Sequence, residues 1–297
     1  MSSSAAIPQM AGSLFLKEIR VSWLFTKHNL STTFIPPVLF TLVAFRASGH
    51  PLVELPGVLG IALIYFWFYD YVFDVHNQIV GVEEDRVNKP YRPIAAGLVT
   101  REGAWVRLLL GMYLYTLIGW WQGVLVWALA WQAMALFLNL GASRHWLWKN
   151  FMMTTGGIVQ LYAAWEMVTP ITPEASAYIL LICMPICLMV SCQDLRDVEG
   201  DKLMNRRTFP MVFGDRFTRW EVAISSAMFP VAAFFVLRFY FGLTPLVMVT
   251  LAVAVLSCAN IAVRVLLLRN KEADHRTYMW FTYWYCFMLA AGFFVLM

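Results

Sequence analysis

The chain has 297 residues, of which 60% are hydrophobic and 13% are charged, and its mean hydropathy is +0.64. Soluble proteins carry about 25% charged residues, so a soluble globular protein is excluded. The net charge of +4 is too small for a nucleic-acid-binding protein, and five cysteines in mostly apolar runs do not indicate a disulfide scaffold. A helical membrane protein remains, because the apolar runs are too long for barrel strands.

Nine apolar stretches are long enough to cross a membrane, since a spanning helix needs about 20 apolar residues. A turn at 119–123 divides the long run 103–142, and a second turn at 242–245 divides the run 220–268. The polar amino-terminal segment lacks a signal-peptide pattern, so the first helix is expected to be uncleaved. We therefore expect one all-α transmembrane domain over residues 1–297, with spans near 29–46, 58–79, 103–121, 123–142, 150–168, 176–194, 220–239, 243–266 and 277–297.

Basic residues gather on one side of this expected bundle. With nine spans, the amino terminus and the loops after spans two, four, six and eight share a side, and every Lys and Arg except Arg46 and Arg238 falls there. Cationic loops stay in the cytosol. We therefore expect this side, which carries the candidate active site, to face the cytosol, in the endoplasmic reticulum membrane if the source is eukaryotic.

Two polar segments share one spacing. A constant offset of 116 residues relates Asn77 to Gln193, Gly81 to Asp197 and Asp85 to Asp201, and each segment is followed by Pro-x-x-x-Gly. This offset predicts an internal duplication with quasi-repeats near 29–142 and 150–266, followed by the ninth helix. Four spans separate the copies, so they form a parallel repeat with both polar segments on one membrane face.

The spacing also indicates a chemistry. Residues four apart share a helical face, so each copy should project its polar groups from one side of a helix end. Neighbouring carboxylates repel unless a cation lies between them, and Mg²⁺ binds a few carboxylates together with substrate phosphate. The adjacent Arg and Lys side chains suit phosphate oxygens. The pattern therefore favours a metal-bridged diphosphate site over two solvated loops with internal ion pairs.

The pattern Asn77-x3-Gly81-x3-Asp85-x2-Asn-Lys-Pro-x-Arg-Pro-x3-Gly97, with Asp194-x2-Asp197-x3-Asp201, resembles the paired aspartate-rich motifs of the UbiA superfamily of intramembrane prenyltransferases. The resemblance implies a nine-helix bundle with a cytosolic polar cap and a lipid-open cavity, where Mg²⁺ binds a prenyl diphosphate. The implied Mg²⁺ ligands and catalytic residues are Asn77, Asp85, Asp197 and Asp201. The implied diphosphate-binding cations are Lys89, Arg92, Lys202 and Arg206, and the resemblance implies that Glu84 and Asp194 lie next to the metal ligands. Asp74 shares a helical face with Asn77, where it either extends the polar wall beside the ligands or bonds to a polar group of a neighbouring helix.

The first motif departs from the family's usual Asn-Asp-x2-Asp-x3-Asp, because Gln78 and Gly81 occupy its second and fifth positions. This version resembles the branch of UbiA-type terpene cyclases, which cyclise a linear prenyl diphosphate without an acceptor. The implied function is a Mg²⁺-dependent, class I-type terpene cyclase, with geranylgeranyl diphosphate favoured over farnesyl diphosphate as substrate. The alternatives are a prenyltransferase with an aromatic or other acceptor and a transporter, although a transporter should place its polar residues near the bilayer midplane.

A cyclase must protect its carbocations from water in a closed pocket. Aromatic rings stabilise such cations by roughly 0.5–2 kcal/mol each, and the chain is 16% aromatic. Candidate cation-stabilising rings are Tyr65, Phe66, Tyr69, Tyr162 and Trp165, with ordinary packing as the alternative role for each. The expected partners are a prenyl diphosphate and the lipid bilayer, with no nucleic acid and no obligate protein partner.

Overall fold

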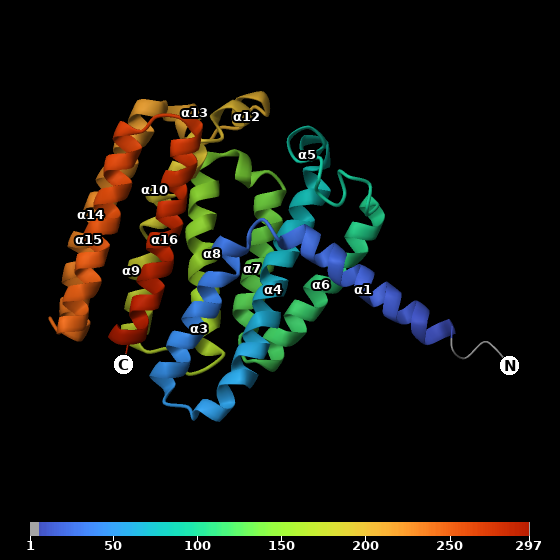
Figure 1. The fold of residues 1–297 in the computed structure, drawn as a ribbon, viewed down its shortest axis with the longest axis horizontal. Coiled ribbons are helices and arrows are strands. Elements are labelled where there is room, and N and C mark those ends of the chain that lie inside the picture. Colours follow the sequence, from blue (N-terminus) through green and yellow to red (C-terminus); the bar gives the residue numbers. More distant parts are fainter. Residues whose placement is uncertain (1–5, 297) are drawn as a thin grey trace.

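The computed structural model describes residues 6–296, which fold into helices joined by short loops. Figure 1 shows the helices side by side in one bundle, with α5, α12 and α13 together at one end, here called the cap. The all-α prediction is confirmed. The long helices are α1 (Ala6–Thr26), α3 (Ile35–Ser48), α4 (Leu55–Val80), α6 (Arg101–Trp121), α7 (Leu125–Asn139), α8 (Trp146–Glu166), α14 (Asp215–Phe241), α15 (Pro245–Leu267) and α16 (Lys271–Val295). The short ones are α2 (Leu30–Thr33), α5 (Val82–Asn88), α9 (Pro173–Cys183), α10 (Ile186–Met189), α11 (Ser191–Leu195), α12 (Val198–Leu203) and α13 (Phe209–Phe213).

Every predicted span overlaps a helix or, for the sixth span, three successive short helices, and the boundaries agree to within six residues. Of the segments that the structure describes, six are long and apolar enough to cross a bilayer. The protein is therefore an integral membrane protein, while the count of nine spans stays a prediction. Residue 297, the last residue of the expected ninth span, lies outside the described residues.

Helix α1 is absent from the sequence prediction and extends away from the bundle (Figure 1). An ion pair of 2.5 Å between Glu18 and Arg107 of α6 attaches it, as does a 2.9 Å hydrogen bond from the Trp67 indole of α4 to the Ser22 hydroxyl. Leu16 and Trp23 remain 67% and 47% exposed. The sequence does not predict this helix as a span because Lys17, Glu18 and Arg20 interrupt its apolar residues, which is typical of a helix lying along a surface.

The sixth expected span is interrupted. Helices α9, α10 and α11 follow one another, and α9 ends two residues before Pro185, which cannot donate a backbone hydrogen bond. Asn150 of α8 compensates for the break, because its side-chain amide donates to the Cys187 carbonyl and the Ser191 hydroxyl, both at 2.9 Å. Helix α8 thus holds the segment that leads into the second polar motif.

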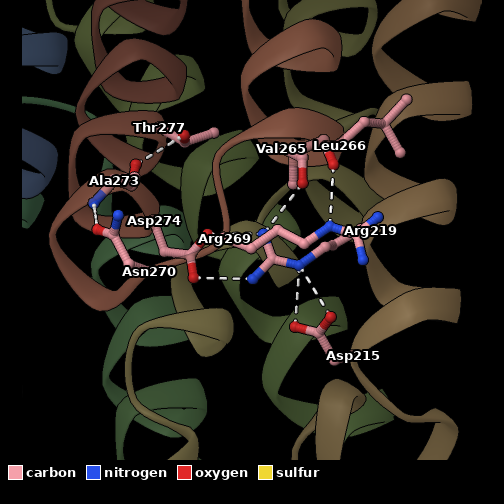
Figure 2. A network of polar contacts seen from close by, with 9 residues as sticks. All are labelled: Asp215, Arg219, Val265, Leu266, Arg269, Asn270, Ala273, Asp274 and Thr277. Atoms are coloured by element: carbon pink, nitrogen blue, oxygen red, sulfur yellow. Dashed lines mark hydrogen bonds and ion pairs between the residues drawn. The ribbon is translucent and has the colours of Figure 1, made fainter.

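A buried arginine joins the last three helices near the cap, as Figure 2 shows. The Arg219 guanidinium of α14 donates two hydrogen bonds to Asp274 of α16, at 2.7 and 2.9 Å, and one of 3.0 Å to the Val265 carbonyl of α15. Its Nε donates to Asp215, one turn earlier, at 2.9 Å. Arg219 and Asp274 are each 3% exposed. This cluster, called the Arg219 clamp below, fixes the start of α14 directly after α13.

Candidate active site

The two polar motifs have the same local backbone. Helix α4 stops at Gly81, with φ −91° and ψ 14°, and α11 gives way to α12 at Asp197, with φ −104° and ψ 3°. Glycine is a poor helix former, and aspartate favours the residue before a helix. The expectation that the polar groups project from one side of a helix end is wrong for the first motif, because the break at Gly81 places Asn77 on α4 and Asp85 on α5. The matching breaks favour an internal duplication, whose boundaries stay a prediction.

Asp85 is buried and held by an arginine of its own motif. Arg92 Nη1 donates to both carboxylate oxygens at 2.9 Å. Burial raises the pKa of the Asp85 carboxyl above its ordinary value, against the opposing effect of Arg92 and Lys89. Lys89 directly follows α5 and lies within electrostatic range of both Asp85 and Asp197, which belong to different motifs. The cap therefore brings these two motifs together.

Asp201 is the equivalent buried carboxylate of the second motif. It accepts a 2.9 Å hydrogen bond from the Thr208 hydroxyl and lies 3.6 Å from Arg206 Nη1. Burial raises the pKa of Asp201 as well, and Thr208 opposes the shift. Asp85 and Asp201 are each 4% exposed. The two motifs thus bury corresponding carboxylates, and each has a cation of its own motif beside it.

An ion pair connects the motifs directly. Arg206 Nη2 of the second motif donates to both oxygens of Glu84 on α5, at 2.7 and 2.8 Å. These residues are 122 positions apart in the chain. Glu84 therefore holds Arg206 beside Asp201, and the first and second motifs form one charged surface.

Lys149 is a site residue that the sequence analysis missed. It lies in the first turn of α8, forms an ion pair with Asp194 and is within electrostatic range of Asp197 and Asp201. Asp194 is 1% exposed, and its Oδ2 has no hydrogen-bond partner among the residues described. Lys149 had counted only toward membrane orientation. A usable signal was its place at the very start of a span, where a lysine side chain reaches the polar face.

The remaining predicted ligands are more open. Asn77 is half-buried in the last turn of α4, and Lys202 is exposed on α12. The Asp197 side chain is 49% exposed and lies 3.4 Å from Arg196 Nε. Their roles stay predictions.

A polar line continues from the cap into the bundle along α4. Asp74 accepts a 2.5 Å hydrogen bond from Asn29, and one turn deeper Asp70 accepts one of 2.7 Å from Thr33. Both carboxyl groups are at most 1% exposed. Gln160 of α8 donates to the Thr33 carbonyl. The segment 29–33 therefore covers the polar face of α4 on which Asn77 also lies.

The candidate aromatic residues come from two helices, with Tyr65, Phe66 and Tyr69 on α4 and Tyr162 and Trp165 on α8. Tyr69 stacks on Trp131 with ring centroids 3.9 Å apart, and Tyr65 lies 4.7 Å from Tyr115. Tyr69 precedes Asn77 by eight residues, or about 12 Å along α4. Tyr162 contacts the Trp127 ring and the Ser176 hydroxyl. The Trp165 ring contacts Phe40, and the Phe66 ring packs against Tyr65. Tyr162 lies about 20 Å along α8 from Lys149. Whether any of these rings meets a cation stays a prediction.

The donor types at the cap fit Mg²⁺, which prefers carboxylate and amide oxygens. Within the described part of the chain, no three His, Cys, Asp or Glu side chains lie close enough together to hold a metal unaided. Each buried carboxylate is instead paired with Arg92, Arg206 or Lys149. The unpartnered Oδ2 of Asp194 is an oxygen donor at the same place. The chemistry of the donor set therefore suits a metal that arrives together with a diphosphate, which supplies the further oxygens.

Known proteins resemble the chain over nearly its whole length. It is 38% identical to "Somaliensene A/B synthase" of Streptomyces somaliensis, over 94% of each chain. It is 35% identical to "Diterpene cyclase eriG" of Hericium erinaceus, over 92% of this chain and 88% of the relative, and 34% identical to "Polyprenyl transferase eriF" of the same fungus, over 92% and 93%. A solved UbiA homologue from Archaeoglobus fulgidus, bound to GPP and Mg²⁺, has the same fold, with a TM-score of 0.69 and 12% identity over 93% of this chain and 99% of that chain. Residues 34–293 match the UbiA prenyltransferase family, so the chain belongs to this family, as its motifs predict.

Proposed function

We propose that the protein is a class I-type terpene cyclase, which ionises a linear prenyl diphosphate and closes the resulting allylic cation on its own double bonds. One observation carries the proposal: the cap joins two acidic motifs and their cations into one site, while Gly81 replaces the carboxylate of the usual first motif. Relatives named as a synthase and a diterpene cyclase support it. A diterpene has twenty carbons, which favours geranylgeranyl diphosphate over farnesyl diphosphate.

The charged residues of the cap divide the work of ionisation. Asn77, Asp85, Asp197 and Asp201 would hold Mg²⁺, which supplies positive charge for the departing diphosphate. Lys89, Arg92, Lys149 and Arg206 bind the diphosphate oxygens, and Lys202 reaches them from α12. Glu84 keeps Arg206 in place. A fixed set of charges in a dry site stabilises the leaving group without reorganising solvent. The buried rings below the cap then exclude water from the cation.

Gly81 explains why the site favours cyclisation over transfer. A Cβ at this position would lie 3.0 Å from the Asn77 carbonyl and 3.8 Å from Asn77 Oδ1. Position 81 therefore adjoins Asn77, so an aspartate there would add a carboxylate beside this predicted ligand once the backbone had given way at the 3.0 Å contact. Without that carboxylate the site lacks one oxygen donor and leaves space beside the head group. The second candidate function is prenyl transfer to an aromatic or other acceptor, which the relative named as a polyprenyl transferase favours.

The reaction type can be tested by omitting any acceptor. We expect the purified protein, given Mg²⁺ and geranylgeranyl or farnesyl diphosphate, to release inorganic diphosphate and a cyclic hydrocarbon or alcohol detectable by gas chromatography and mass spectrometry. If diphosphate is released only after an aromatic acceptor is added, and the product carries the prenyl chain, the prenyltransferase reading replaces the cyclase.

We further propose that the cap faces the cytosol and that the protein resides in the endoplasmic reticulum if its source is eukaryotic. Cysteines introduced at Lys89 and Lys202, both exposed at the cap, should react with a membrane-impermeant maleimide only after the membrane is permeabilised. A cysteine at Val53, 83% exposed at the opposite end, should react in intact cells if the protein lies in a plasma membrane, and only after the internal membrane is also dissolved if it lies in the endoplasmic reticulum. The unaltered chain, whose own cysteines are buried or half-buried, is the control. Labelling of Lys89 and Lys202 from different sides would contradict the parallel repeat.

A further inference from the structure

A cavity of about 580 Å³ lies at the end of the bundle opposite the cap. Its walls come from α3, from the turn that leads into α4 and from α16. Helices α3 and α16 pack against each other, and their far ends lie side by side in Figure 1. Nine of the eleven lining residues are apolar, and the other two are Arg46 and His50. A cavity of this size is in the range of small-molecule sites.

The cavity runs along the helices. Leu39 and Arg46 both line it and lie seven residues apart on one face of α3, or about 10 Å along the helix axis. Arg46 is in the last turn of α3, so the charged end of the cavity is at the end of the bundle and the apolar end lies deeper. Leu52 and Phe294 of its wall are 78% and 51% exposed, so the cavity opens toward the surroundings of the bundle. This shape suits a hydrocarbon chain that stands parallel to the helices.

Two aromatic rings hold the cationic groups at the charged end. The Arg46 guanidinium lies 4.6 Å from the centroid of the Phe293 ring, and its Nε donates to the Phe293 carbonyl at 3.0 Å. The His50 ring stacks on the Phe45 ring with centroids 6.1 Å apart, and its Nδ1 lies 2.9 Å from the Glu54 carboxylate. A protonated imidazole donates from both nitrogens, so His50 can bind Glu54 and a second anion together.

Arg46 lies where a cation is not needed for membrane orientation. It is one of two arginines that the sequence places on the side opposite the cap, where the positive-inside rule disfavours cations. The other is Arg238, in the last turn of α14, which does not line this cavity. Arginine is well suited to phosphate oxygens because its planar group donates two parallel hydrogen bonds. A cation beside an apolar cavity at this level therefore complements a lipid, whose phosphate and chain are joined in the same order.

We propose that this cavity binds one phospholipid from the leaflet opposite the cap. Its phosphate lies at Arg46 and His50, and one acyl chain extends along Leu39 and Ala290. An anionic headgroup is preferred to phosphatidylcholine, whose own positive charge would lie near Arg46. Because α3 is the first long helix inside the bundle and α16 is the last, the lipid joins the two ends of the fold. The site is separate from the cap and does not depend on the proposed reaction.

The test measures the unfolding temperature of the detergent-solubilised full chain as phosphatidylglycerol or phosphatidylcholine is added, since a ligand of the folded state raises it. Phosphatidylglycerol should act at the lower concentration. Arg46→Met should raise its half-maximal concentration about fivefold, the size of one cation near anionic lipid, and remove the preference over phosphatidylcholine. His50→Leu should act in the same direction. Ala290→Phe, at a half-buried position of the wall, should weaken both lipids equally by filling the space for the chain.

Matched controls separate this site from general effects of charge and size. Arg238→Met removes the same charge from the same side of the membrane, and its response to phosphatidylglycerol should equal that of the wild type. Ala232→Phe makes the same enlargement in a second cavity, of about 640 Å³ between α9 and α14, whose lining within residues 6–296 includes no charged side chain. It should leave the preference for phosphatidylglycerol unchanged. The unfolding temperature of each variant without lipid reports any damage to the fold.

Three results would overturn the proposal. The first is an unaltered response to both lipids in Arg46→Met and His50→Leu. The second is stabilisation by inorganic phosphate as large as that by phosphatidylglycerol and unaffected by Ala290→Phe, which would indicate an anion site without a lipid chain. The third is an equal loss in Arg238→Met, which would indicate attraction to the whole surface. If Arg46→Met fails to fold, wild-type titrations of both His50→Leu and Ala290→Phe would still reject the site.

Discussion

Alanine at Asp85, Asp197 or Asp201 should lower diphosphate release from the prenyl substrate by about a hundredfold or more, since a lost metal ligand removes about 3 kcal/mol of charge stabilisation. The cause is local, because these carboxylates lie at the cap and away from the apolar contacts that hold the bundle together. Asp197→Ala, at a side chain that is 49% exposed, should lose turnover with little change in unfolding temperature, whereas Asp85→Ala and Asp201→Ala also remove the buried partners of Arg92 and Arg206 and should lower the unfolding temperature as well. Rates are read from released diphosphate under saturating substrate.

Glu83→Ala is the matched control for these variants. Glu83 lies on α5 with Asp85, but its side chain is 77% exposed and pairs with Arg86 on the outer surface. It should leave turnover within about twofold, as is usual for an exposed ion pair. Excess EDTA should lower the turnover of the wild type as strongly as the three aspartate substitutions do. Full activity in EDTA, or in all three variants, would contradict the metal-assisted mechanism.

Replacement of Arg219 by methionine should destabilise the fold by about 3–5 kcal/mol, because it leaves the Asp274 carboxylate buried without its partner. The Asp274 carboxylate is 4% exposed and takes two hydrogen bonds from this arginine. Unfolding is followed by the loss of helical circular dichroism in detergent as temperature or denaturant rises. Turnover at low temperature should be affected less than stability, since the clamp lies outside the charged surface that binds diphosphate.

Arg276→Met is the comparison for the clamp. Arg276 pairs with Glu272 on the same helix, α16, where both side chains are at least 67% exposed. Exposed pairs contribute little to stability because water competes for both charges. The unfolding transition of this variant should coincide with that of the wild type. If Arg219→Met unfolds at the same temperature or denaturant concentration as Arg276→Met, the clamp does not hold the last three helices together.

The course of the helices could be predicted from the sequence because a spanning helix needs a continuous apolar run, which is a local property. Helix α1 lacks such a run, and the break near Pro185 is disguised by apolar residues on both sides. The backbone breaks at Gly81 and Asp197 also escaped, since a spacing of four residues fits one helix as well as two. Each miss reflects an arrangement that tertiary contacts decide.

The sequence predicted a site residue only where that residue belonged to one of the two repeated motifs. The repeat placed Asp85 and Asp201 in one site, and the ion pair between Glu84 and Arg206 agrees with that placement. Lys149 carries no motif and reaches Asp194 only through the packing of α8, so its role required the structure.

The attachment of the interrupted span to α8 has a consequence for biogenesis. Lys149 and Asn150 precede their partners Ser191 and Asp194 in the chain, so ribosomal synthesis brings them into the membrane first. A helix interrupted at Pro185 that entered lipid alone would carry unsatisfied backbone groups at a cost of several kcal/mol. Because α8 is already inserted, the emerging segment meets a waiting cation and amide. The order of translation therefore lets the earlier helix α8 satisfy the polar groups of the later segment as that segment is inserted.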